Sequence, residues 1–192
     1  MRKLISLVLF LLCVNSAQAD RFYVDADAPA GGNGQSWASA FQFLQDALDQ
    51  TVTGRVDEVW IAEGTYYPDD GTSVTEGDRT ASFVLKDGVS LYGGFQGNET
   101  DLSQRNITNH VSILSGSIFA DQQFWSLHVC TVGANASVAF DGLTVRDGNA
   151  NGTSEPNNCG GAVYASGQTN SLIYVTSCVF TNNSASWRGG VA

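Results

Sequence analysis

A short pattern returns near the end of the chain, and this repeat constrains the fold more than any other feature. Gly160-Gly161-Ala162-Val163 is followed by Val179-Phe180-Thr181-Asn182-Asn183, and Gly189-Gly190-Val191-Ala192 then begins the pattern again. A return after about 30 residues is typical of a solenoid, whose coils bury their apolar side chains only against neighbouring coils. The sequence therefore predicts a stack of similar coils whose last coil is open at Ala192.

An earlier segment carries a second copy of the pattern. Residues 141–150 align with residues 177–185, and each segment is followed by a double glycine. Asn and Gly tolerate left-handed dihedrals, so we expect them at the corners between strands rather than in a catalytic site. A double glycine also permits a tight bend and a close approach of two backbones. The residues given a structural role in the repeat are Gly160, Gly161, Phe180, Asn182, Asn183, Gly189 and Gly190.

Most of the chain reads as short β-strands that end at Gly, Asn or Asp. The one predicted helix covers Ser36 to Leu48, because Trp37, Phe41, Leu44 and Leu48 fall on one face and Ser36 suits an N-cap. A β-sandwich would normally show two-residue hairpin turns as well. The predicted strands are 21–25, 58–62, 82–85, 89–95, 111–116, 126–132, 137–145 and 172–180.

Four segments resemble the start of pectin-lyase-like right-handed parallel β-helix proteins: Tyr23-Val24-Asp25, residues 34–41, residues 44–48 and residues 59–66. The Gly-Gly-Ala-Val and Phe-Thr-Asn-Asn motifs are similar to the GGA(I/L/V) and FxxN repeats of chlamydial-type polymorphic outer membrane proteins. The resemblance implies an all-β chain that forms a right-handed parallel β-helix. It also implies an N-terminal amphipathic helix that caps the solenoid, while the C-terminal end is expected to be uncapped.

The first 19 residues have the pattern of a signal peptide. Met1-Arg2-Lys3 is basic, residues 4–14 are apolar, and Ala17-Gln18-Ala19 suits cleavage before Asp20. The apolar run is too short to span a bilayer comfortably. We expect an exported protein, secreted or held at the cell surface or outer membrane, and not membrane-spanning. Residues 20–192 would be the N-terminal part of a β-helix domain, with a capping strand and helix at about 21–50 and coils from about 56 onward.

Acidic residues dominate the charge. The formal net charge is -10 and the pI is near 4.3, which argues against a nucleic-acid partner. Asp69, Asp70 and Asp78 lie with Glu76 in a glycine-containing loop and are weak calcium candidates, although their spacing matches no EF-hand frame. No cofactor other than calcium is expected.

Three cysteines remain after the predicted signal peptide. Cys159 and Cys178 lie about one coil apart, so a disulfide between neighbouring coils is one alternative. The other alternative is that Cys130 and Cys178 are thiols of the core, because both stand in apolar strand patterns.

No catalytic constellation is evident. The histidines, His110 and His128, lie outside the Gly-His-Gly motif of pectin hydrolases, and Arg146 and Asp147 would point to opposite faces of a strand. Aromatic residues at Trp60, Tyr66 and Tyr67 could stack on sugars or pack internally. We expect a structural or adhesive fragment of a bacterial surface protein, with a carbohydrate or host-surface ligand, that associates through its open last coil. The alternative is a polysaccharide lyase or hydrolase whose active-site coils follow Ala192.

Overall fold

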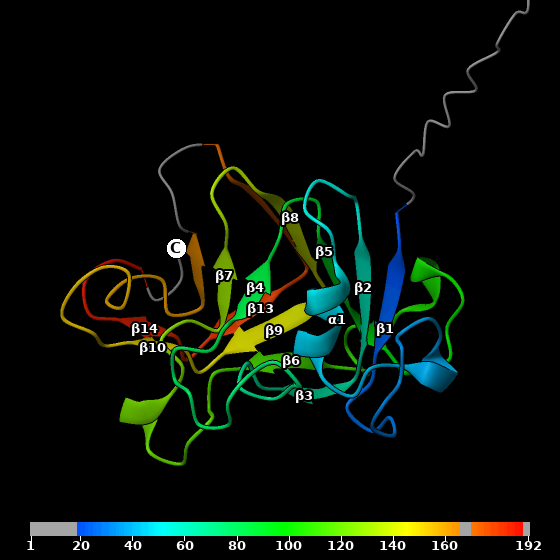
Figure 1. Ribbon diagram of the computed structural model, residues 1–192, viewed down its shortest axis with the longest axis horizontal. Coiled ribbons are helices and arrows are strands. Elements are labelled where there is room, and N and C mark those ends of the chain that lie inside the picture. Colours follow the sequence, from blue (N-terminus) through cyan, green and yellow to red (C-terminus); the bar gives the residue numbers. More distant parts are fainter. Residues whose placement is uncertain (1–18, 166–169, 190–192) are drawn as a thin grey trace, which may run out of the picture.

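The computed structural model describes residues 19–165 and 170–189, which form a parallel β-solenoid (Figure 1). Its one α-helix is α1 (Leu44–Gln50), and three 3-10 turns cover Trp37–Ser39, Leu102–Gln104 and Gln122–Phe124. The strands are β1 (Arg21–Val24), β2 (Glu58–Ala62), β3 (Gly64–Tyr66), β4 (Phe83–Leu85), β5 (Ser90–Phe95), β6 (Ser112–Ser115), β7 (Cys130–Val132), β8 (Ser137–Asp141), β9 (Leu143–Arg146), β10 (Asn149–Ala150), β11 (Val163–Ala165), β12 (Leu172–Thr176), β13 (Val179–Thr181) and β14 (Ser184–Ala185).

Each strand pairs in parallel with its counterpart in the next coil. The first sheet has the order β1-β2-β5-β8-β12, the second β3-β6-β9-β13 and the third β4-β7-β11, while β10 and β14 form a short fourth pair. The chain visits the sheets in the same order in every coil. Equivalent positions of successive coils are therefore direct neighbours across the hydrogen bonds.

The core consists of columns of apolar side chains along the solenoid. In the first sheet the register places Phe22, Val59, Leu91 and Phe140 above one another, and all four are buried. Similar columns fill the inner faces of the second and third sheets. Burial of such side chains is the main favourable term for a fold whose contacts all lie between neighbouring coils.

The aligned repeat of the sequence is confirmed by the strand register. Val145 pairs with Phe180, and Ala150 pairs with Ala185. Three predicted strands were too long, however: the run 126–132 shortens to β7, and two other runs each contain a corner. The run 137–145 divides into β8 and β9 at Gly142, whose φ is 72°, and the run 172–180 divides into β12 and β13 at Ser177, whose φ is 51°. A residue at positive φ turns the chain by a corner, and the apolar pattern continues through that corner because both strands face the core.

The N-terminal helix is shorter than the sequence predicts. The residues before it form a 3-10 turn and then a bridge in which Phe41 pairs with Val24, so the helical hydrogen bonds begin only at Leu44. Ser36 makes no capping hydrogen bond with its side chain. Phe41 donates its N–H to Tyr23 and accepts from Asp25, and these strand-type bonds replace the first helical turns. Leu44, Ala47 and Leu48 nevertheless join the core, as predicted.

Asn and Gly occupy corners of the coils. Asp147 and Asn182 hold equivalent positions at φ 64° and 55°, and Asn182 donates from Nδ2 to Oδ1 of Asp147 over 2.6 Å. Ser115 of the preceding coil donates to the other carboxylate oxygen of Asp147 over 3.0 Å. Asn183 bonds the neighbouring coil through the N–H of Gly148 and the carbonyl of Val145. The corner side chains thus form a short polar ladder between coils.

The double glycine serves close packing. A Cβ atom on Gly161 would collide with the carbonyl oxygen of Ser184 in the next coil. Gly160 and Gly189 share a left-handed conformation, with φ values of 58° and 54°, and the bridge between Cys159 and Arg188 joins the residues before them. Gly190 lies outside the described residues.

The three cysteines are free thiols in this structure, and a bridge between Cys159 and Cys178 stays a prediction. Cys130 is fully buried in β7, as expected of a core thiol. Burial, assisted by the nearby Cys178, raises the pKa of the Cys130 thiol well above its ordinary value.

The coil of β12 and β13 is the least covered part of the solenoid. Leu172, Tyr174, Val175 and Val179 are each at least half exposed. Within the described ranges no strand pairs with the outer edge of β12 or β13, and association through this coil stays a prediction. None of the helices in those ranges is long and apolar enough to cross a membrane.

Candidate functional site

Three successive connections leave the solenoid at the same corner, between the second and third sheets. We call residues 67–82 the first loop, residues 116–129 the second loop and residues 147–162 the third loop. Each lies one coil beyond the previous one, so the parallel register sets them side by side. Loops fixed on a rigid solenoid are the usual place for binding residues in such folds.

An acidic hollow lies between the first and second loops. Tyr67, Asp69, Asp70 and Glu76 of the first loop line it with Ser117 and Ile118 of the second, around a volume of about 230 Å³. Asp69 is buried and accepts the N–H of Gly77 over 2.9 Å. The structure therefore brings two of the three predicted calcium candidates to one place, together with Glu76.

Asp70 is electrostatically distinct within the acidic hollow. Burial and the negative charges of Asp69 and Glu76 raise the pKa of Asp70 above its ordinary value. The hollow therefore presents grouped carboxyl groups, whose oxygens can accept hydrogen bonds from a hydroxylated ligand.

Asp78 does not belong to the acidic hollow. Its Oδ1 accepts from the N–H and the hydroxyl of Thr80, over 2.8 and 2.6 Å, and these bonds lower the pKa of Asp78. The three calcium candidates thus do not form one ligand set. Among the described residues, no group of three or more His, Cys, Asp or Glu side chains is placed to hold a metal ion.

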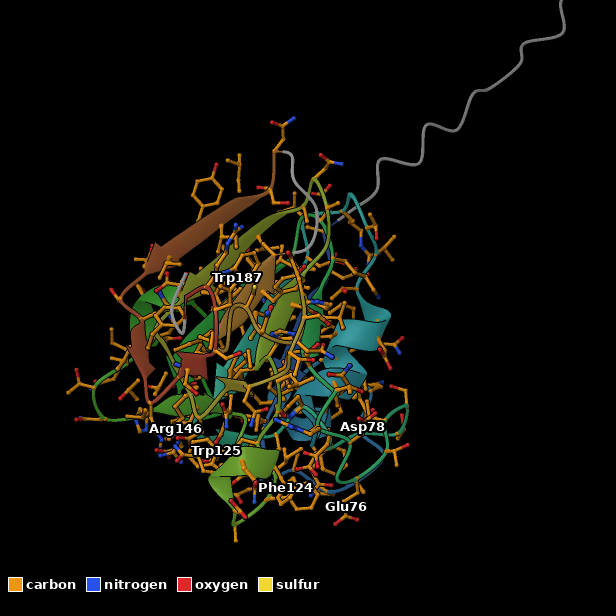
Figure 2. The ribbon with its side chains drawn as sticks, turned by 90° about the vertical axis from the view of Figure 1, so that its left-hand side faces the viewer. Glu76, Asp78, Phe124, Trp125, Arg146 and Trp187 are labelled. Carbon is orange, nitrogen blue, oxygen red and sulfur yellow. The ribbon has the colours of Figure 1, made fainter. Side chains whose placement is uncertain are left out.

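An exposed aromatic pair stands beside the acidic hollow, on the second loop. The rings of Phe119 and Phe124 are 42 and 48% exposed and meet edge to face at 6.2 Å. The ring of Phe119 lies over Gly77 of the first loop, where a Cβ atom would come within 3.1 Å of it. Figure 2 shows Phe124 and Trp125 at the same end of the molecule as Glu76 and Asp78.

A partly buried guanidinium joins the three loops. Arg79 of the first loop donates to the carbonyl oxygens of Trp125 and Asn149 and to Oδ1 of Asn151, over 2.8 to 3.2 Å. Asn151 in turn donates to the carbonyl of Gln123 over 3.1 Å. Trp125 closes the second loop by donating from Nε1 to the carbonyl of Phe119 over 3.0 Å. The aromatic pair is therefore held in a defined position.

Two further hollows continue the acidic one toward α1. A hollow of about 200 Å³ shares Tyr67 and Asp70 with it, and a third, of about 220 Å³, shares Gln42 and Phe43 with the second. Neighbouring hollows share lining residues, so the three hollows lie next to one another between the second loop and α1.

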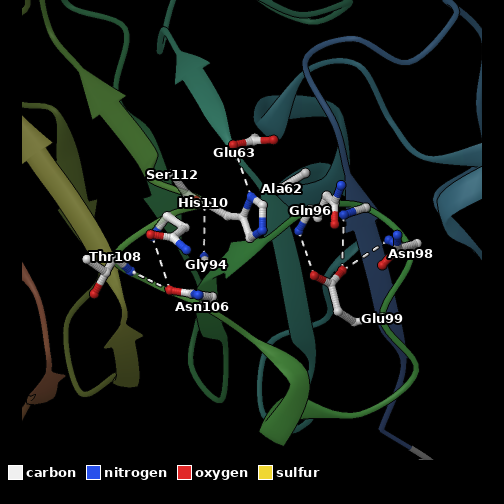
Figure 3. A network of polar contacts seen from close by, with 12 residues as sticks. Ala62, Glu63, Gly94, Gln96, Asn98, Glu99, Asn106, Thr108, His110 and Ser112 are labelled. Atoms are coloured by element: carbon white, nitrogen blue, oxygen red, sulfur yellow. Dashed lines mark hydrogen bonds and ion pairs between the residues drawn. The ribbon is translucent and has the colours of Figure 1, made fainter.

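Other polar groups are committed to the scaffold. Figure 3 shows the carboxylate of Glu99, which accepts the N–H groups of Gln96, Gly97 and Asn98. Although burial opposes it, these bonds lower the pKa of Glu99. In the same figure Nδ1 of His110 pairs with Glu63 over 3.1 Å. Neither group faces a hollow described above.

The charged residues Asp141, Arg146 and Asp147 are also held in contacts within the scaffold. Asp141 pairs with Arg105 over 3.1 Å, while both carboxylate oxygens of Asp147 are occupied by the corner ladder. The left-handed conformation of Asp147 does bring Arg146 within 3.2 Å of it, although alternation along a strand would separate them. These groups act within the scaffold rather than in an open site.

Of the aromatic residues that the sequence offered for stacking on sugars, two are buried in the scaffold. Trp60 is fully buried and stacks on Phe95 at 4.6 Å, and Tyr66 is buried with its hydroxyl bonded to the carbonyl of Ala62. Tyr67 lines two of the hollows, and the buried Tyr66 lines one of them, the hollow of about 200 Å³. The sequence did not single out Phe119 and Phe124. The signal that could have done so is a cluster of aromatic residues, at positions 119, 124 and 125, in a segment without strand periodicity.

Comparison with protein-family models, with curated proteins and with solved structures finds no match for this chain. The parallel β-solenoid therefore rests on the structure itself.

Proposed function

We propose that this chain is the binding part of an exported bacterial surface protein, a right-handed β-helix of the pectin-lyase-like type that adheres to carbohydrate. The observation that carries this proposal is the aromatic pair Phe119 and Phe124, exposed beside an acidic hollow. Aromatic faces stack on the C–H faces of sugars, and carboxyl groups bond their hydroxyls. The fixed position of the aromatic pair, whose loop is held by the bonds of Arg79 and Trp125, favours adhesion.

The negative charge of the site limits the class of glycan that it can bind. Asp69, Asp70 and Glu76 line the acidic hollow, while the net charge of the chain is -10. A uronate polymer would bring further negative charge to this place, which costs energy. We therefore propose a neutral glycan or an amino sugar rather than polygalacturonate as the ligand.

Glycan binding is tested by calorimetry with cello-oligosaccharides, chitosan oligosaccharides and oligogalacturonates. We expect binding of a neutral or amino-sugar ligand, and about fivefold weaker binding by Phe124→Ala, since an aromatic contact contributes about 1 kcal/mol. Tyr174→Ala removes an aromatic side chain of similar exposure from β12 and should bind as the unaltered protein does. Absence of binding, or equal affinity of Phe124→Ala, would contradict the proposal.

A second candidate function is glycosidic bond hydrolysis, favoured by the grouping of Asp69, Asp70 and Glu76 around one hollow. Glycosidases use a pair of carboxyl groups, one as general acid and the other as base or nucleophile. This activity predicts release of reducing ends from a bound glycan and its loss in Asp70→Asn. Binding without release of reducing ends would leave adhesion as the function.

A further inference from the structure

The first residue after the predicted signal peptide is anchored by a buried carboxylate. The backbone nitrogen of Asp20 donates to Oδ1 of Asp57 over 3.1 Å, and the carbonyl of Asp20 accepts from Glu58 over 2.9 Å. Asp57 has no exposed surface. Asp20 therefore occupies a fixed position, in register with the start of β1 and β2.

The charges around this position do not balance in the uncleaved chain. Arg55 pairs with Asp57 over 2.6 Å and with the side chain of Asp20 over 2.9 Å, so one guanidinium serves two carboxylates. The neighbouring pair Arg21 and Glu58, at 2.9 Å, is balanced in itself. One positive charge is missing at the nitrogen of Asp20, which is a neutral amide as long as Ala19 precedes it.

We propose that cleavage before Asp20 creates an ion pair between the new α-ammonium group and the buried Asp57, so that maturation itself stabilises the fold. Hydrolysis of the Ala19–Asp20 peptide bond leaves a carboxylate on Ala19 and an amine on Asp20, which is protonated below its pKa. The α-ammonium then supplies the missing charge where the amide N–H already lies. A charged donor bonds a carboxylate more strongly than a neutral amide does.

The environment of Asp57 suits this role. Although burial alone would raise the pKa of Asp57, its bonds with Arg55, Val52 and Asp20 lower it below the ordinary value. Asp57 therefore stays ionised at neutral pH. Its second oxygen, Oδ2, accepts the N–H of Val52 over 2.9 Å, which leaves Oδ1 facing Arg55 and Asp20.

The pH dependence follows from the sign of the expected pKa shift. An ion pair raises the pKa of the α-amino group in the folded protein above its unfolded value of about 7.7–8.0. The added stability is then complete below the unfolded pKa and disappears as the pH rises through the folded pKa. It also disappears in acid, where Asp57 becomes protonated.

The test compares two purified chains, one beginning at Asp20 and one beginning at Ala19. A protease that leaves no extra residue produces both, so the comparison does not depend on cleavage in a cell. At pH 6.5 we expect a folding equilibrium constant about tenfold larger for the chain that begins at Asp20, which equals one unit of pKa shift. Urea unfolding followed by circular dichroism measures it. The advantage should vanish at pH 10.5 and in Asp57→Asn versions of both chains.

Several outcomes would overturn the ion pair. Equal stability of the two chains at pH 6.5 would do so, as would an advantage that persists at pH 10.5 or in the Asp57→Asn background. If Asp57→Asn does not fold, the comparison of the two chains at pH 6.5 and pH 10.5 still tests the ion pair, because it needs no substitution. Edman sequencing of the exported protein tests the cleavage separately, and a start at a residue other than Asp20 would show that maturation does not create this pair.

Discussion

Replacement of Gly148 by alanine should push apart the two ends of the third loop. A Cβ atom on Gly148 would collide with the carbonyl oxygen of Gly161 and touch the side chain of Val129. Its distance from the oxygen would fall below the 3.0 Å limit that Cβ atoms essentially never cross, and the obstacle is backbone that cannot rotate away. The two ends of the third loop must therefore move apart, which disturbs the hydrogen bonds that Gly148 makes to the next coil.

The loss in free energy of unfolding follows from the hydrogen bonds that Gly148 makes. The carbonyl of Gly148 accepts from Ser184 over 2.8 Å, and its N–H donates to Asn183 over 2.9 Å. Loss of two such bonds costs about 2 kcal/mol, and forced overpacking adds about 1–3 kcal/mol. We expect Gly148→Ala to lower the free energy of unfolding by about 3–5 kcal/mol.

Urea unfolding followed by tryptophan fluorescence measures this loss. With a slope of about 2 kcal/mol per molar urea, the midpoint should fall by about 2 M. Gly133→Ala is the matched control, because a Cβ atom there meets nothing within 4 Å, and its midpoint should stay within about 0.3 M of the unaltered protein. Equal midpoints for the two variants would refute the argument that the close approach of the two loop ends requires glycine at position 148.

Three further predictions concern other parts of the scaffold. Asn182→Ala should be less stable than Asn182→Gly by about 1–2 kcal/mol, because both lose the ladder bond but only alanine is strained at φ 55°; equal urea midpoints would contradict this. Arg79→Lys should speed proteolysis of the second loop, since an ammonium group cannot reach the acceptors that a guanidinium spans, and an unchanged cleavage rate would count against the role of Arg79. Cys130 should resist a thiol reagent until the protein unfolds, because burial keeps it protonated, whereas the partly exposed Cys178 should react in the native protein; equal native rates would exclude this difference.

The repeat made much of the fold predictable. A residue that faces the core packs against the equivalent residue one coil away. The alignment of Val145 with Phe180 therefore predicted that these two residues are neighbours in space. The corners were less visible. Ser177 adopts a left-handed conformation that its residue type does not favour, and the coil geometry imposes it.

The candidate site was predictable only in part. Asp69 and Asp70 are adjacent in the sequence, and their proximity to Glu76 follows from one loop. The aromatic pair is placed by contacts that span the three loops, such as the bond from Arg79 to Asn151, 72 residues away. No local pattern encodes such a bond, so the sequence alone could not show that the aromatic rings stand beside the carboxyl groups.

The common origin of the three loops at one corner has a consequence for the variation of this protein. Each loop begins and ends on strands whose register is fixed by the neighbouring coils, while its sequence is not part of the interior columns. Substitutions, insertions or deletions at this corner can therefore change the surface with little effect on the core. Since Arg79 joins the three loops, such changes in recognition must occur together in neighbouring coils, while the scaffold that carries them stays the same.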